Sequence, residues 1–156
     1  MTKLSGLQGD SSLTFGLGIY YLVVKLNRSI NRFFFSAVFL SFAWNIFLLI
    51  GVILNFSFAH TRAAGGQFAD FPTVVRVIYV ILLALVVYQA WIFKLIFKAK
   101  LIKFVWLPRL FVIVGVIGIL LNAVSRSVNE RWNVIPAAII SWGFWYYGVK
   151  VEKSVL

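Results

Sequence analysis

The stretch FFFSAVFLSFAWNIFLLIGVILNFSF, residues 33–58, decides the fold class of this chain. It contains no Asp, Glu, Lys or Arg side chain. A helix that crosses the hydrocarbon core of a bilayer needs about 20 predominantly apolar residues. The run is long enough, so we predict a transmembrane helix over residues 33–58.

Three further apolar runs follow, over residues 74–93, 105–124 and 133–149. Pro108 is compatible with the start of a helix, because a proline in the first turn loses no intrahelical hydrogen bond. Together with residues 33–58, these runs predict an all-α fold. We expect an integral membrane four-helix bundle that forms one transmembrane domain over residues 1–156.

The segment SSLTFGLGIYYLVV, residues 11–24, is also apolar but shorter. At about 1.5 Å per helical residue, its apolar centre covers roughly 18 Å, which is short for a membrane span. We predict a short N-terminal interfacial helix over residues 11–24. The alternative is a fifth span, with the N-terminus on the outside.

Composition excludes several other classes of protein. Hydrophobic residues make up 62% of the chain and charged residues 12%, whereas roughly a quarter of a soluble protein is charged. The net charge of +11 lies beside the apolar runs, which favours anionic lipid headgroups at the cytoplasmic face over nucleic acid. The chain has no cysteine, and its polar start, MTKLSGLQGD, does not match a cleavable signal, so we expect it to be retained.

Basic residues predict the orientation, because cytoplasmic loops near span ends collect Lys and Arg. The side that holds the 59–73 loop has only Arg62, Arg76, Arg126 and Arg131. We therefore predict a multi-pass protein of the cell membrane with both termini in the cytoplasm. The basic residues of the predicted cytoplasmic side are Lys3, Lys25, Arg28, Arg32, Lys94, Lys98, Lys100, Lys103, Arg109, Lys150 and Lys153.

Four polar side chains inside the spans are candidate functional residues: Asn45, Gln89, Asn122 and Ser141. Polar groups at membrane depth usually face the protein interior, where an interhelical hydrogen bond contributes about 0.6–2 kcal/mol. Spacing places Asn122 on one helical face with Gly115 and Gly118, which predicts close helix packing there. The four residues either join the helices or line a path for a small solute.

The spans contain no Asp, Glu or His. Ion-coupled transport usually needs a carboxylate or imidazole at membrane depth. The absence of such side chains disfavours that function. We expect no cofactor and no metal site, because haem would lack a histidine in the spans and no metal-ligand spacing occurs.

Ionisable groups gather in the loop at residues 59–73 and in the turn before the last span. We expect a ligand-binding cluster of His60, Arg62, Arg126, Glu130 and Arg131, since arginine side chains offer planar donors for phosphate or carboxylate. The alternative is a structural turn. There Ser127 and Glu130 would form a capping box, and Asn133 would cap the fourth span.

The turn also carries a short pattern, N..S.S..ERW...P, made by Asn122, Ser125, Ser127, Glu130, Arg131, Trp132 and Pro136. It resembles a pattern in small four-span membrane proteins predicted from actinobacterial genomes, which have no assigned activity. The resemblance implies a bacterial cytoplasmic membrane and the same four-span plan. It implies no particular function.

Three functions remain open. The first is a non-enzymatic integral membrane protein that packs with a membrane-protein partner or a second copy, or that binds lipid or an anionic ligand at its outer face. The second is a small-solute transporter or channel subunit. The third is a lipid-modifying enzyme that works at the outer interface through His60, Glu130 and the arginines, with Glu130 and His60 as acid and base. We assign no catalytic residue, because no nucleophile has a matched base.

Overall fold

A computed structural model describes residues 11–98 and 106–150 of the chain. The predicted cytoplasmic residues Lys3, Lys100, Lys103 and Lys153, both chain ends and residue 105 of the third predicted span lie outside the described residues. The chain divides into two compact units, residues 1–34 and 35–156, which are described separately here.

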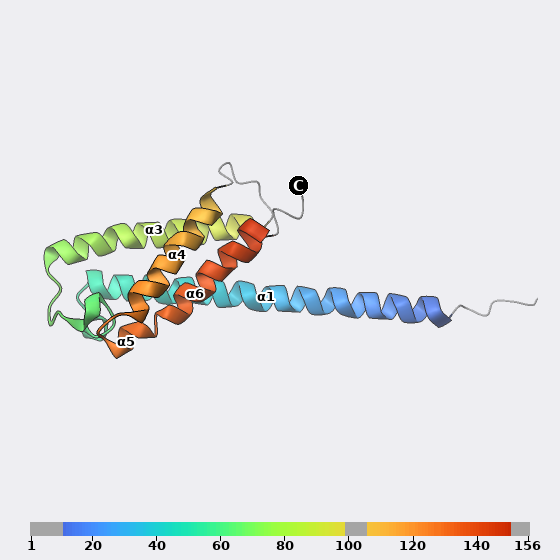
Figure 1. Cartoon of the computed structure of the whole chain (residues 1–156), viewed down its shortest axis with the longest axis horizontal. Helices are drawn as coiled ribbons and strands as arrows, with labels where there is room; N and C mark the ends of the chain where they lie inside the picture. The colour runs from blue at the N-terminus through green and yellow to red at the C-terminus, as the bar shows by residue number, and fades with distance from the viewer. Residues whose placement is uncertain (1–10, 99–105, 151–156) are drawn as a thin grey trace, which may run out of the picture. The chain divides into compact units, whose positions relative to one another are not determined.

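The described residues are helical and contain no strand, which confirms the predicted all-α class (Figure 1). Four helices carry the apolar runs, three short ones lie in the connections, and a π-helix follows the last of the four. The helices in chain order are α1 (Ser11–Ile53), α2 (Ser57–His60), the 3-10 helix η1 (Ala64–Gly66), α3 (Thr73–Phe97), α4 (Leu107–Ala123), α5 (Val128–Arg131), α6 (Val134–Gly143) and the π-helix η2 (Phe144–Lys150).

Two helical segments, Asn31–Ile53 and Thr73–Phe97, are long and apolar enough to cross a membrane. Leu107–Ala123 is apolar but shorter. Only 28% of the apolar window in the first segment and 17% of that in the second are buried. The core helix of a soluble protein hides its apolar side chains, whereas here leucine, isoleucine, valine and phenylalanine side chains remain on the surface. This exposure favours lipid as the surrounding medium.

The start of α1 differs from the prediction. Residues 11–24 are not a separate helix, because α1 runs without a break from Ser11 to Ile53. The connecting sequence KLNRSINR, residues 25–32, contains neither Pro nor Gly. Its basic and polar residues separate two apolar segments in the sequence. They do not interrupt the hydrogen bonds of the helix, however, so one helix continues through them.

The end of α1 also differs, since the helix stops at Ile53 rather than at residue 58. Asn55 has a φ of 59°, which is the left-handed conformation that often terminates a helix. Phe56 N donates to Gly51 O at 2.8 Å and Asn55 N to Val52 O at 3.1 Å, the hydrogen-bond pair of a Schellman motif. Arg76 Nε on α3 donates to Ile53 O at 2.6 Å, so a cation stabilises the carbonyl end of α1.

Within residues 35–156, one core cluster takes side chains from all four apolar segments. Val38 and Phe42 of α1 meet Phe93 of α3, Phe111 of α4 and Phe144 of η2. A second cluster, which includes Val52, Ala59 and Phe71, packs the end of α1 against the connection to α3. The second cluster therefore holds this connection in place.

Helices α4 and α6 approach closely at one glycine. A Cβ atom on Gly115 would lie 2.7 Å from Ser141 Cβ, so only glycine fits there. Gly118, which the sequence predicted on the same packing face, has open space where its Cβ would be. That part of the prediction was wrong, because the helices meet along a narrower strip than the residue spacing indicated.

Candidate functional site

The candidate site lies where two connections meet: the α1–α3 loop (residues 54–72) and the α4–α6 turn (residues 124–133). Three side-chain hydrogen bonds to the backbone join them. Gly65 N donates to Glu130 Oε2 at 2.7 Å, Ser127 Oγ donates to Thr61 O, and Asn133 Nδ2 donates to Arg62 O at 3.1 Å. The structure therefore brings together the loop and the turn that supply the predicted cluster.

Glu130 makes only half of the predicted capping box. The Ser127 hydroxyl accepts from Glu130 N at 3.4 Å, as predicted. The Glu130 carboxylate does not return to Ser127 N, however, because it accepts from Gly65 N and from Ser125 Oγ at 2.5 Å. Ser127 N donates to Ser125 Oγ at 3.2 Å instead. Glu130 therefore ties the turn to the loop.

Gly65 can present its N–H to Glu130 because of its backbone conformation. Its φ is 72°, and the neighbours Ala64 and Gly66 also have positive φ values, of 50° and 68°. Gly66 N donates to Ala63 O at 3.0 Å, so Gly65 supplies the N–H that faces the turn. The Glu130 carboxylate is the anion that Gly65 N binds here.

His60 belongs to a different hydrogen-bond network, centred on Asn55. The Asn55 Oδ1 atom accepts from Phe71 N at 2.9 Å and lies 3.1 Å from His60 Nε2, while Asn55 Nδ2 donates to Asp70 Oδ1 at 2.9 Å. His60 Nε2 donates in this arrangement, since its partner oxygen can only accept. The structure thus places His60 and Glu130, considered above as an acid and a base, in separate networks.

Asn133 does not cap α6, although the sequence predicted that role. It has helical φ and ψ values and makes no side-chain cap hydrogen bond. Its side chain is buried and forms a bridge: Trp44 Nε1 donates to Asn133 Oδ1 at 3.0 Å, and Asn133 Nδ2 donates to Arg62 O. The Asn133 amide thus joins the start of α6 to α1 and to the α1–α3 loop. Water can satisfy the N–H groups at the start of a helix, whereas the buried groups that bond to Asn133 need a partner within the protein.

The arginines of the predicted cluster have no carboxylate partners. Arg131 Nε donates to Ser125 O at 2.8 Å, and the Arg62 guanidinium lies 5.8 Å from the centre of the Trp44 ring, in a cation–π contact. Arg126 is exposed and lines a pocket of about 300 Å³ with Gly65 and Glu130, among others. In the part of the chain that the structure describes, none of these three arginines forms an ion pair with Asp or Glu.

The four polar residues of the predicted spans do not form one site. Asn45 Nδ2 donates to Ser41 O at 3.0 Å and Asn122 Nδ2 to Gly118 O at 2.7 Å, so both amides bond within their own helices. Ser141 Oγ reaches Val112 O of α4 at 3.2 Å. Gln89 is buried, and its side chain makes no hydrogen bond to the residues described here.

Several residues of the site were missed by sequence reasoning, chiefly Asn55, Trp44 and Ser125. Asn55 follows the apolar run of α1, and an asparagine at that position is a known helix stop signal. Nothing local indicates that Trp44 and Ser125 would bond to Asn133 and Glu130. Among residues 11–98 and 106–150, no three His, Asp or Glu side chains gather as metal ligands would.

Both carboxylates of the site accept hydrogen bonds from neutral donors, and no carboxylate among the described residues pairs with Arg62, Arg126 or Arg131. These arginines can therefore donate hydrogen bonds to an anion. No protein-family model matches this chain, and neither does any curated protein sequence or solved structure.

Proposed function

We propose that this protein is a non-enzymatic, multi-pass protein of the bacterial cytoplasmic membrane that binds an anionic group at its outer face. In this proposal α1, α3, α4 and α6 with η2 cross the bilayer, and both termini lie in the cytoplasm. The 17 residues of α4 extend about 25 Å, a length that a bilayer tolerates by thinning slightly. The α1–α3 loop and the α4–α6 turn lie outside.

The observation that carries the proposal is the charge balance of the outer face. Arg62, Arg126 and Arg131 have no carboxylate partner in the described structure, because Asp70 and Glu130 serve the loop and the turn. Arginine side chains bind phosphate and carboxylate through planar pairs of N–H donors. Clustered arginines at headgroup level therefore support the binding of an anionic lipid headgroup.

The hydrogen bonds argue against the two other functions. Catalysis at the outer face would need a carboxylate or imidazole free to exchange a proton with a substrate, but Glu130 and His60 each hold a connection in place. A solute path would need polar groups turned away from their own helix, yet the amides of Asn45 and Asn122 bond to backbone carbonyls one turn earlier.

Thermal unfolding in detergent micelles tests the proposal. A ligand that binds the folded state raises the melting temperature, so we expect added phosphatidylglycerol to stabilise the protein more than phosphatidylcholine does. Since the attraction is electrostatic, this difference should shrink when NaCl is raised to about 1 M, where the screening length is about 3 Å.

A pair of double variants locates the effect. Replacing Arg126 and Arg131 with Gln should remove most of the preference for phosphatidylglycerol. Replacing the same two residues with Lys keeps the positive charge at these positions and should retain most of the preference. Equal stabilisation of the wild type by both lipids, or equal losses in the two double variants, would contradict the proposal.

A further inference from the structure

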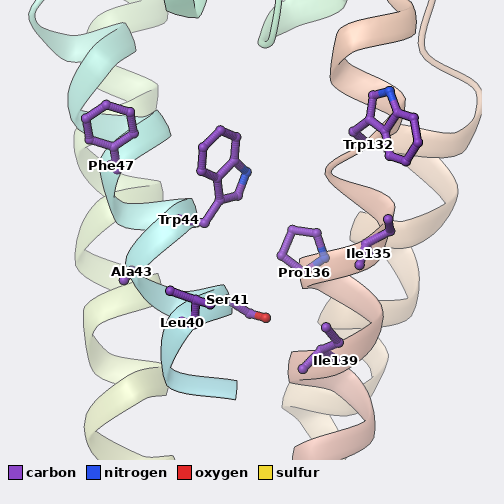
Figure 2. A pocket seen from close by; sticks show the side chains of 9 residues that line it. All are labelled: Leu40, Ser41, Ala43, Trp44, Phe47, Trp132, Ile135, Pro136 and Ile139. Atoms are coloured by element: carbon purple, nitrogen blue, oxygen red, sulfur yellow. The ribbon is translucent and has the colours of Figure 1, made fainter. Parts of the chain in front are cut away.

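An apolar groove of about 580 Å³ lies between α1 and α6 (Figure 2). Trp44 of α1 and Pro136 of α6 point toward each other across it. Its volume falls within the range of roughly 300–1,000 Å³ that is typical of small-molecule sites. The residues that matter for the argument are Ala43, Trp44 and Phe47 on one side and Trp132, Pro136 and Ile139 on the other.

The walls of the groove offer little to a polar ligand. Ser41 is the one hydroxyl residue among those that line it, and its Oγ atom already donates to Ala37 O at 2.8 Å. The indole N–H of Trp44 is likewise committed, to Asn133. The part of a ligand that occupies the groove is therefore a hydrocarbon chain.

One end of the groove carries a positive charge. Trp44 lines the groove, and the guanidinium of Arg62 lies over its ring at 5.8 Å. Arg62 is half-buried and makes no ion pair with any described carboxylate, and Asn133 holds its backbone in place. A partly desolvated cation is stabilised by an anionic partner, and residues 11–98 and 106–150 supply none at this position.

A ligand that satisfies both ends has an apolar chain and an anionic head. We propose that a single anionic phospholipid binds here, with an acyl chain in the groove between α1 and α6 and its phosphate against Arg62. The proposal rests on the function proposed above, and it adds one defined lipid position to the general attraction of the outer arginines.

A partner helix fits the groove less well than a lipid. A helix with its side chains is about 10 Å wide, and a stable protein interface covers about 800 Å² on each partner. The groove is a local recess beside Trp44 rather than an extended face of that size. A single hydrocarbon chain matches its dimensions, and the adjoining cation matches a phosphate.

Native mass spectrometry of the full chain tests this inference. The protein is extracted from bilayers of phosphatidylcholine and phosphatidylglycerol in equal amounts and washed with detergent to remove loosely held lipid. We expect one retained phospholipid per chain, with phosphatidylglycerol enriched over phosphatidylcholine. Ala43→Trp fills the groove and should abolish retention, whereas Ala84→Trp, at an exposed position of α3, should not.

Arg62→Gln tests the headgroup contact and leaves the Arg62 backbone carbonyl in place for Asn133. We expect the enrichment of phosphatidylglycerol to fall by about tenfold, because the variant loses one charge-assisted contact with the headgroup. The Arg62→Lys variant, which keeps a positive charge at the same position, should retain most of it. Because Arg62 is not among the residues that line the groove, Arg62→Gln also keeps the inference testable if Ala43→Trp fails to fold.

Three outcomes would overturn the inference. One is undiminished lipid retention in Ala43→Trp, and another is unchanged lipid selectivity in Arg62→Gln. The third is loss of a second protein chain, rather than of a lipid, from the Ala43→Trp sample.

If the melting temperature still rises with phosphatidylglycerol in these cases, the outer arginines bind lipid and only the groove assignment is wrong. If the wild type shows no such rise, the proposed function itself fails.

Discussion

Two asparagines and one glutamate organise the α1–α3 loop and the α4–α6 turn. Asn55 ends α1 in a left-handed conformation and uses both ends of its amide to hold the loop near Phe71 and Asp70. Asn133 links Trp44 to the Arg62 backbone, and Glu130 binds Gly65 N. These bonds satisfy polar groups that folding would otherwise leave without partners. Each of them also joins two segments that are separated in the sequence.

Glu130 provides the prediction at the scale of one residue. In Glu130→Ala, Gly65 N and Ser125 Oγ lose their acceptor, so we expect a loss of about 1–3 kcal/mol in the free energy of unfolding. Glu130→Gln keeps one carbonyl oxygen as an acceptor and should lose less. Chemical denaturation in detergent measures both variants, and amide hydrogen exchange at Gly65 reports the local bond.

The two variants also separate structure from chemistry. If Glu130 were a catalytic carboxylate with no structural role, Glu130→Ala would unfold at the same denaturant concentration as the wild type. Unchanged exchange at Gly65 in that variant would likewise contradict the role assigned here.

At the scale of elements, the contact between α4 and α6 depends on one glycine. Gly115 lets Ser141 approach, and Ser141 then donates to Val112 O across the interface. Interhelical contacts in membranes rely on small residues, because lipid gives apolar side chains no reason to prefer each other. The missing side chain at Gly115 therefore determines how closely α4 and α6 pack.

Gly115 and Gly118 form a matched pair for a test of this contact. In Gly115→Ala the new Cβ atom would overlap Ser141, so we expect a loss of about 1–3 kcal/mol from overpacking. In Gly118→Ala the Cβ atom meets nothing within 4 Å, and alanine favours the helix by about 1 kcal/mol over glycine. That variant should be as stable as the wild type or more so.

Melting temperatures of the two glycine variants in one detergent decide the matter. Similar destabilisation by both would show that the packed face extends to Gly118, as the residue spacing alone indicated.

The helices could be predicted from the sequence, but several contacts and helix ends could not. Hydropathy is a local property, so the apolar runs located α3 and α4 closely. The end of α1 depends on Asn55, whose partners Phe71 and Asp70 come from further along the chain. Similarly, spacing placed Gly118 on a packing face, but the rotation of α4 against α6 is set by tertiary contacts.

The same limit applies to the candidate site. Charge distribution predicted that the 59–73 loop and the turn before the last span share one side, and the structure joins them at Gly65 and Glu130. The charge distribution did not predict that Glu130 would bind a backbone N–H instead of an arginine. That choice depends on the left-handed conformation of Gly65, which becomes useful only when the turn lies beside it.

At the scale of the whole molecule, the long helices leave large apolar side chains on the surface, while the connections carry many of the polar contacts. Ile81 on α3 is 65% exposed, and Leu40 on α1 is 73% exposed. Continuous apolar surfaces of this kind are rare on soluble monomers. Lipid contact explains them together with the placement of the basic residues.

Substituted-cysteine labelling tests this central claim most directly, because the natural chain has no cysteine. Single cysteines replace Ala69 in the α1–α3 loop, Lys98 at the other end of α3, and Ile81 within that helix, all exposed positions. A membrane-impermeant maleimide is then applied to right-side-out and to inside-out vesicles. We predict labelling of Ala69→Cys in the first, of Lys98→Cys in the second, and of Ile81→Cys in neither. Labelling of Ala69→Cys and Lys98→Cys from the same side, or of Ile81→Cys as readily as Ala69→Cys, would contradict the account.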